Sequence, residues 1–142
     1  MKVGFKKVKS YAMVPAKASK GAAAYDLYAS EEAYIGPLQT LAIGVGIALE
    51  IPEGWKGEVY SRSGMAKRGI VVANSPGKID SDYRGEIFVL LHNTSMHDIA
   101  GIKRGDRIAQ LEINPCHEIE FQETLDLTST KRGEKGFGST GK

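Results

Sequence analysis

The chain has 142 residues, which fits one domain able to bury about 70% of its unfolded surface. Its hydrophobic content of 42%, charged content of 25% and net charge of +2 are ordinary for a globular protein and do not indicate a nucleic-acid surface. No apolar run approaches the roughly 20 residues of a membrane-spanning helix, and no signal-peptide pattern opens the chain. We therefore expect a cytoplasmic protein (host cytoplasm, if the source is a virus) that binds neither membrane nor nucleic acid.

Lysines crowd the first twenty residues, and we interpret them as one solvated face rather than a targeting arm. They are Lys2, Lys6, Lys7, Lys9, Lys17 and Lys20. Cys116 is the single cysteine, so no intrachain disulfide can form and a reducing compartment fits. A small buried residue is the role we expect for Cys116.

Short strand-like runs separated by Gly, Pro and Asn make up the body of the chain. Val45–Ile51 alternates with a period of two, and Pro52-Glu-Gly54 ends it with a turn. Further runs are Glu58–Tyr60, Ile70–Ala73, Ile87–Leu91 and Ile108–Ile113. Strands at this spacing predict an all-β sandwich or barrel.

One segment predicts a short helix near residues 63–69. Ser63 is a good N-cap, the residues that follow tolerate helix, and Gly69 is a good stop.

Residues 74–85 predict a polar hairpin between two of the strand-like runs. The segment contains Pro76-Gly77, a turn signal, and runs on to Gly85. In an extended chain Asp80 and Asp82 share one face, and Tyr83 points the other way. A carboxylate here suits a general base, and Tyr83 suits a flat wall for a sugar or a base. Solvated turn aspartates are the plainer interpretation of this stretch alone.

The composition changes at about residue 127. Thr128–Lys142 contains no aliphatic side chain, so it cannot bury enough surface to order itself. We divide the chain into a β domain at 1–127 and a flexible tail at 128–142, in which Phe137 is the one large apolar side chain. The tail is either a segment that orders on a ligand or a dispensable terminus. Gly136–Lys142 fits the first positions of a P-loop but lacks the following Ser/Thr and helix, so we reject a kinase or ATPase.

Five motifs in order resemble those of the trimeric dUTP diphosphatases (dUTPases). They are Ala22-Ala-Ala-Tyr-Asp-Leu-Tyr-Ala29, Arg62-Ser-Gly-Met-Ala66, Gly77-Lys-Ile-Asp-Ser-Asp-Tyr-Arg-Gly85, Gly105-Asp-Arg-Ile-Ala-Gln110 and Arg132 with Gly136-Phe-Gly-Ser-Thr-Gly141. The resemblance implies a jelly-roll-like β fold with one short helix. It also implies hydrolysis of dUTP to dUMP and pyrophosphate by water attack on the α-phosphate, which limits uracil in DNA and supplies dUMP for thymidylate synthesis.

The resemblance assigns a role to each motif. Asp80 aligns with the base that deprotonates the water, and Gln110 bonds a phosphate oxygen or that water. The expected phosphate contacts are Arg62, Ser63, Gly64, Arg132, Gly138, Ser139 and Thr140. The expected nucleoside contacts are Asn74, Gly77, Ile79, Tyr83 under the deoxyribose and Phe137 over the uracil. Asp26 and Asp82 are expected to be structural, and Asp106 and Arg107 to pair within or between chains.

The resemblance further implies Mg²⁺ held by the phosphates and water, with no direct protein ligand, and a homotrimer whose active sites are shared between chains. The sequence departs from the family pattern at three positions: Ala24, where the family often has glycine, Lys78, at a position that is usually apolar, and Lys135, in place of a tail glycine. Two alternatives stay open: a dCTP deaminase-like enzyme of the same fold, and a nucleotide-sensing regulatory protein.

Overall fold

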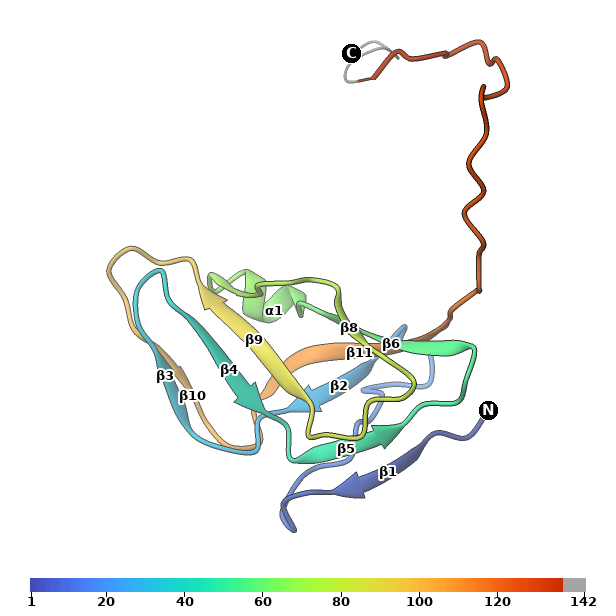
Figure 1. Cartoon of the computed structure of the whole chain (residues 1–142). Helices are drawn as coiled ribbons and strands as arrows, with labels where there is room; N and C mark the ends of the chain where they lie inside the picture. Colours follow the sequence, from blue (N-terminus) through green and yellow to red (C-terminus); the bar gives the residue numbers. More distant parts are fainter. Residues whose placement is uncertain (137–142) are drawn as a thin grey trace.

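The computed structural model describes residues 1–136, and it is nearly all β (Figure 1). The elements are β1 (Gly4–Lys7), β2 (Tyr25–Tyr28), β3 (Ala33–Ile35), β4 (Thr40–Gly44), β5 (Ile47–Glu50), β6 (Trp55–Tyr60), α1 (Ser63–Ala66), β7 (Ile70–Val72), β8 (Gly77–Ile79), β9 (Phe88–Asn93), β10 (Ala100–Ile102) and β11 (Arg107–Pro115). This architecture confirms the predicted all-β fold class. Within residues 1–136, no helix is long and apolar enough to span a membrane.

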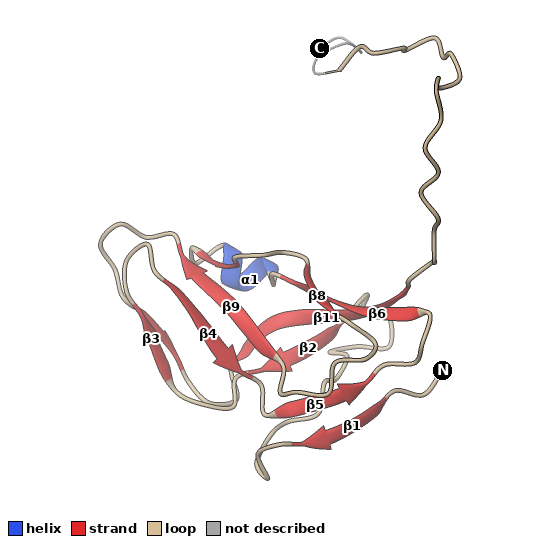
Figure 2. Ribbon diagram, viewed as in Figure 1, coloured by secondary structure: helices blue, strands red, loops and turns tan. Residues whose placement is uncertain are grey.

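The strands form two larger sheets and two strand pairs, all of them antiparallel (Figure 2). One sheet has the order β2-β11-β6-β8, the other has the order β4-β9-β7, and the pairs are β1-β5 and β10-β3. The core is formed where all of them contribute aliphatic side chains. Its largest fully buried members include Leu27, Ile35, Ile43, Ile47, Ile70, Leu91, Ile102 and Ile108.

Side-chain alternation explains how the strands divide core from surface. In β9, Val89 and Leu91 are buried whereas Phe88 and Leu90 are exposed. The alternation predicted for Val45–Ile51 is wrong, because Ile47, Ala48 and Leu49 of β5 are all buried. A strand covered on both faces reads as a continuous apolar run.

The predicted helix is shorter than expected and is capped differently. α1 spans Ser63–Ala66, and its N-cap is Arg62, which has extended backbone angles and makes no side-chain cap hydrogen bond. Ser63 is therefore the first helical residue, and its prediction as N-cap is wrong. Gly69 does lie beyond the helix with φ +78°, a conformation that glycine adopts without strain.

The predicted hairpin is correct in its pairing and wrong in its connection. β7 and β9 pair antiparallel, with Ile70 opposite Asn93 and Val72 opposite Leu91. The chain between them crosses to the other sheet, where β8 pairs with β6. After β8 the backbone turns, since the Tyr83 amide donates to the Asp80 carbonyl at 3.2 Å. The shared face predicted for Asp80 and Asp82 therefore does not exist.

β11 ends at Pro115, and from there the chain leaves the body in an extended path (Figure 1). Residues 116–136 are exposed and contain no strand. Cys116 is exposed as well, so its predicted burial is wrong. The division at residue 127 stays a prediction.

Candidate functional site

Asp80 lies directly after the last residue of β8 and is exposed. Within residues 1–136, no hydrogen bond or ion pair engages its carboxylate. An ionised carboxylate without a protein partner is free to accept a proton from a water. Asp82 is exposed in the turn that follows.

The predicted nucleoside contacts gather around β8. Gly77 and Ile79 are buried strand residues, and Asn74 packs against Gly77. A Cβ on Gly77 would come within 3.1 Å of the Asn74 amide nitrogen, so the bare backbone allows this approach. The Gly77 backbone and the Asn74 side chain thus present polar groups at one place.

Tyr83 is fixed by its hydroxyl rather than by burial. Its side chain is 45% exposed, and its hydroxyl donates to the Glu86 carbonyl at 2.9 Å. The ring lies over Gly85, where any Cβ would collide with it. Glycine at position 85 is therefore what lets the Tyr83 ring fold back onto the loop.

A second group of predicted residues surrounds the buried carboxylate of Asp26. Arg62 Nε donates to Asp26 Oδ1 at 2.8 Å, and Arg107 Nη1 donates to Oδ2 at 3.4 Å. Arg62 Nη1 also donates to the Arg107 carbonyl at 2.9 Å. Asp26 is only 3% exposed, so it holds both guanidinium groups in place with an excess of positive charge.

Gln110 and the start of α1 belong to this second group. In β11, Gln110 lies opposite Asp26 on one side and Tyr60 on the other, so the three side chains share one face of the sheet. Ser63 and Gly64 are exposed just beyond β6. Their amide groups have no acceptor inside the helix, because they belong to its first turn.

Asp80 and Gln110 are separated within one chain. Ile79 lies opposite Gly57, so Asp80 follows at the level of Lys56, whereas Gln110 lies opposite Tyr60 on the other side of β6. The four strand steps from Lys56 to Tyr60 span roughly 13 Å, and two interstrand spacings of about 4.8 Å add to that. One water molecule cannot contact both side chains of the same chain.

The predicted tail residues fall partly outside the described part of the chain. Arg132 is exposed in the extended segment, where its Nε donates to the Lys135 carbonyl at 3.0 Å. Phe137, Gly138, Ser139 and Thr140 lie outside the described residues.

Glu58 of β6 is a buried carboxylate, only 7% exposed, that accepts hydrogen bonds from neighbouring side chains. Hydrogen bonds from Lys78, Asn114, Tyr60 and Lys56, in order of effect, lower the pKa of Glu58 to about 2. Lys78, which departs from the family pattern, is thus a partner of Glu58 on the neighbouring strand.

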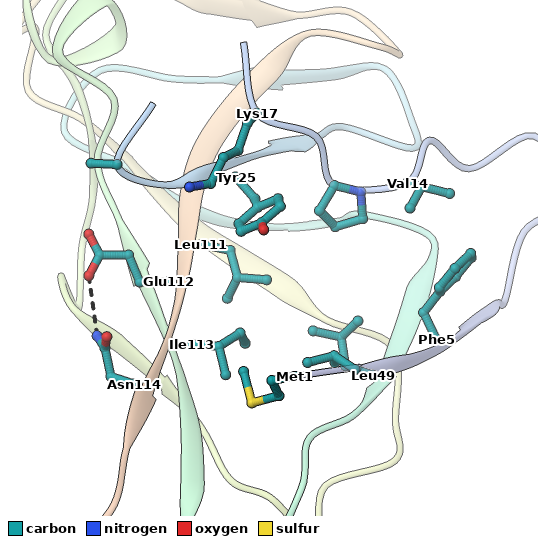
Figure 3. Close-up of a pocket in the computed structure, with 13 residues that line it drawn as sticks. Met1, Phe5, Val14, Lys17, Tyr25, Leu49, Leu111, Glu112, Ile113 and Asn114 are labelled. Carbon is teal, nitrogen blue, oxygen red and sulfur yellow. Dashed lines mark hydrogen bonds between the residues drawn. The ribbon is translucent and has the colours of Figure 1, made fainter. Parts of the chain in front are cut away.

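A cavity of about 430 Å³ has Asn114, a hydrogen-bond partner of Glu58, in its wall (Figure 3). Most of its lining residues are apolar, and they come from the N-terminal segment, β2, β5 and β11. The lining includes Met1, Phe5, Val14, Leu49, Leu111 and Ile113. No residue predicted for the site lines the cavity.

Sequence reasoning missed one network beside Tyr83. Lys9 Nζ lies 3.1 Å from Glu31 Oε2 and 3.6 Å from Glu86 Oε1, so the prediction that Lys9 belongs to a solvated face is wrong. The signal that points to this network is the Gly44-Val45-Gly46 segment, where glycines leave room for a side chain from elsewhere in the chain.

A family model, related sequences and a solved structure all point to the same protein family. The dUTPase family model matches residues 10–141. A deoxyuridine 5'-triphosphate nucleotidohydrolase from Nautilia profundicola is 48% identical over 100% of both chains, and one from a Hydrogenobaculum species is 43% identical over 99% of both. The structure of a mutant Staphylococcus bacteriophage 80alpha dUTPase with dUpNHpp superposes with a TM-score of 0.90 at 27% identity, covering 99% of this chain and 98% of that one. The match over nearly the whole length, together with the motifs around Asp80 and Gln110, shows that the chain belongs to the dUTPase family.

Proposed function

We propose that this chain hydrolyses dUTP to dUMP and pyrophosphate by attack of water on the α-phosphorus, limiting uracil in DNA and supplying dUMP. The observation that carries the proposal is the exposed, unpartnered carboxylate of Asp80 at the end of β8, in a chain 48% identical to a named dUTP nucleotidohydrolase. Asp80 accepts a proton from the water as the oxygen bonds to phosphorus, and pyrophosphate leaves. A positioned base of this kind contributes about 10²–10⁴ in rate.

The residues around Asp26, which are Arg62, Ser63, Gly64 and Gln110 and are called the Asp26 group below, bind the phosphates. Arg62 is held in place by the buried Asp26 carboxylate, so its remaining N–H groups are oriented before the substrate arrives. The hydroxyl of Ser63, the amide groups of Ser63 and Gly64, and the side chain of Gln110 add neutral donors. Preorganised donors of this kind stabilise charge that develops on the phosphate oxygens.

The residues around β8, which are Asn74, Gly77, Ile79 and Tyr83 and are called the β8 group below, select the nucleoside. Uracil presents two carbonyl acceptors around an N–H donor, and the Asn74 side chain with the Gly77–Ile79 backbone offers complementary groups. Cytosine reverses part of this pattern and leaves buried polar groups unpaired. The Tyr83 ring packs under the deoxyribose and leaves no space for a 2′-hydroxyl.

The tail acts as a lid over the bound nucleotide. Arg132, Ser139 and Thr140 contact the terminal phosphates together with Gly138, and Phe137 stacks over the uracil. The support is compositional, because a segment without aliphatic side chains orders only when a ligand supplies the contacts.

Mg²⁺ enters with the triphosphate as part of the substrate. Residues 1–136 contain no cluster of three or more metal-ligating side chains, and the Asp26 carboxylate is engaged by two arginines. Phosphate oxygens and water are the ligands that Mg²⁺ prefers. A solved dUTPase from phage phi11 of S. aureus is described with a structural Mg(II) ion, which is a property of that protein.

The active site is shared between chains of a homotrimer. Support comes from the separation of Asp80 and Gln110 along β6, which prevents one chain from placing both on one water. A neighbouring copy related by rotation brings its Asp26 group to the β8 group of the first copy.

The segment 117–127 supports this assembly, because it carries apolar side chains with no cover from its own chain. Ile119 is 71% exposed, Phe121 91%, Leu125 103% and Leu127 92%. The mainly apolar cavity beneath the N-terminal strand fits such a segment from a second copy. Acidic residues of the segment, such as Glu118 and Glu120, complement exposed lysines such as Lys6 and Lys17 near the cavity.

Pyrophosphate release measured with dUTP, dCTP, dTTP and UTP tests the proposed function. We expect release from dUTP to dominate, with no ammonia from dCTP. Dominant release from another nucleotide, or ammonia release from dCTP, would contradict the proposal. Neither alternative activity has support from the residues or the comparisons. A cytoplasmic location fits the free and exposed thiol of Cys116.

A further inference from the structure

The carboxylate of Glu86 lies in a cradle formed by two glycines. Its Oε1 accepts a hydrogen bond from the Gly46 amide at 2.8 Å. A Cβ on Gly44 would approach the same oxygen to 2.5 Å, so the Glu86 carboxylate can take this position only while residue 44 has no side chain. Gly46 has φ +72°, which directs its N–H at the carboxylate without strain in a glycine. The side chain of Glu86 is 14% exposed, so the cradle is largely closed to water.

Lys9 closes the cradle from the N-terminal segment. Its ammonium lies 3.6 Å from Glu86 Oε1 and donates to Ser30 Oγ at 2.9 Å and Glu31 Oε2 at 3.1 Å. Burial lowers the pKa of Lys9, but the hydrogen bond to Glu31 and the charges of Glu86 and Glu31 outweigh burial and raise it overall. Lys9 is therefore charged at neutral pH. The network ties the loop after Gly85 to the Gly44–Gly46 segment and to Glu31.

The backbone of Glu86 in turn holds Tyr83. The Glu86 carbonyl accepts the Tyr83 hydroxyl at 2.9 Å, and Ile87 is fixed by hydrogen bonds on both sides. Its amide donates to the Ile47 carbonyl at 2.9 Å, and its carbonyl accepts from Val45 at 3.0 Å. Because Tyr83 is 45% exposed, packing alone does not place its ring. The position of the Glu86 backbone therefore decides where the ring lies.

We propose that Glu86 and Lys9 are positioning residues that hold the Tyr83 ring and thereby set the preference for deoxyribonucleotides over ribonucleotides. The inference rests on the proposed function, in which Tyr83 packs under the sugar. A pocket that excludes a hydroxyl only by shape has limited discrimination, up to about a hundredfold, and a small displacement of its wall removes much of it. Loss of the cradle frees the loop and opens space for the 2′-hydroxyl.

The test compares kcat/KM for dUTP and for UTP, by pyrophosphate release, in full-length variants. Glu86→Ala removes the acceptor of Gly46 and the partner of Lys9, and we expect the dUTP-to-UTP ratio to fall about tenfold. Glu86→Gln keeps an oxygen for the Gly46 amide and should restore most of the ratio. Lys9→Met should fall between these two. Glu32→Ala and Lys7→Met, at neighbouring positions outside the network, are the matched controls and should keep the parental ratio.

Tyr83→Phe removes the hydroxyl at the other end of the same chain of contacts. We expect it to lower the ratio, and the double variant with Glu86→Ala to lose little more, because both changes release one ring. A folded Glu86→Ala protein with the parental ratio, or fully additive losses, would overturn the inference. If Glu86→Ala does not fold, Lys9→Met decides: an unchanged ratio overturns the inference. Parental failure to hydrolyse dUTP would instead refute the proposed function.

Discussion

The carboxylates of Glu58 and Asp80 differ in the number of hydrogen bonds that they accept. Glu58 of β6 accepts hydrogen bonds from four side chains, whereas the Asp80 carboxylate after β8 has no partner within residues 1–136. The hydrogen bonds to Glu58 stabilise its negative charge and tie its side chain to the neighbouring strands. Because the Asp80 carboxylate accepts no such bonds from the described residues, it is available to contact a water molecule. Residue type alone does not separate these roles.

Asp80→Asn tests the base directly, because the amide keeps the shape but cannot accept the proton of water. We expect turnover to fall by roughly 10²–10⁴ while binding of a non-hydrolysable dUTP analogue persists. Asp82→Asn, in the same exposed turn, is the control and should turn over like the parent. Single-turnover kinetics and titration calorimetry measure the two quantities. Parental turnover in Asp80→Asn would show that another group is the base.

Glu58 makes the folding stability of the chain depend on pH in the acidic range. Its pKa is lowered from 4.5 to about 2 in the folded chain, so its hydrogen bonds stabilise the fold above pH 4.5, and this contribution disappears as pH falls toward 2. We expect the melting temperature of the parent to fall more steeply over this window than that of Glu58→Gln. Glu53→Gln, at an exposed turn position, should follow the parent. Parallel curves for parent and Glu58→Gln would contradict the assignment.

Some strands can be predicted from their local sequence, whereas others form only because they pair with strands distant in the chain. The all-β class and the strands at Ile70, Ile108 and neighbouring runs follow from apolar residues and turn signals. β1 and β8 do not, because their few residues depend on pairing with distant strands. The N-cap prediction for Ser63 fails because Arg62 is held extended by its bond to Asp26, 36 positions away in the chain.

The same distinction applies to the candidate site. The motif positions could be predicted because each motif is local. The Arg107–Asp26 contact joins residues 81 positions apart, and the Gly46–Glu86 bond joins residues 40 apart. Local sequence spacing cannot predict contacts between residues so far apart in the chain.

The tail is an element whose role can be tested by removal. Deleting residues 129–142 should leave the melting temperature and the assembly unchanged, because no strand or core residue lies beyond Pro115 in the described chain. We expect dUTP hydrolysis to fall severely, since the proposed lid and its proposed phosphate contacts are lost. Circular dichroism and pyrophosphate release measure the two effects. A well-folded truncated protein with full activity would refute the lid.

In the whole molecule, the sheet order separates two of the predicted site residues from each other. β6 lies between β8 and β11, so Asp80 and Gln110 are on opposite sides of one strand and at different levels along it. The two side chains therefore do not meet within a single chain. In the proposed homotrimer, rotational symmetry would bring each Asp80 to the Gln110 of a neighbouring chain.

Mixing two inactive variants tests this shared site most directly. Asp80→Ala and Gln110→Ala chains are unfolded together in equal amounts, reassembled, and assayed for pyrophosphate release beside each variant treated alone. Random assembly gives about three quarters mixed trimers, and one site of three in each mixed trimer has both side chains intact. If sites are shared between chains, roughly a quarter of all sites recover activity. Mixed trimers, verified by mass, that are as inactive as either variant alone would contradict the shared site.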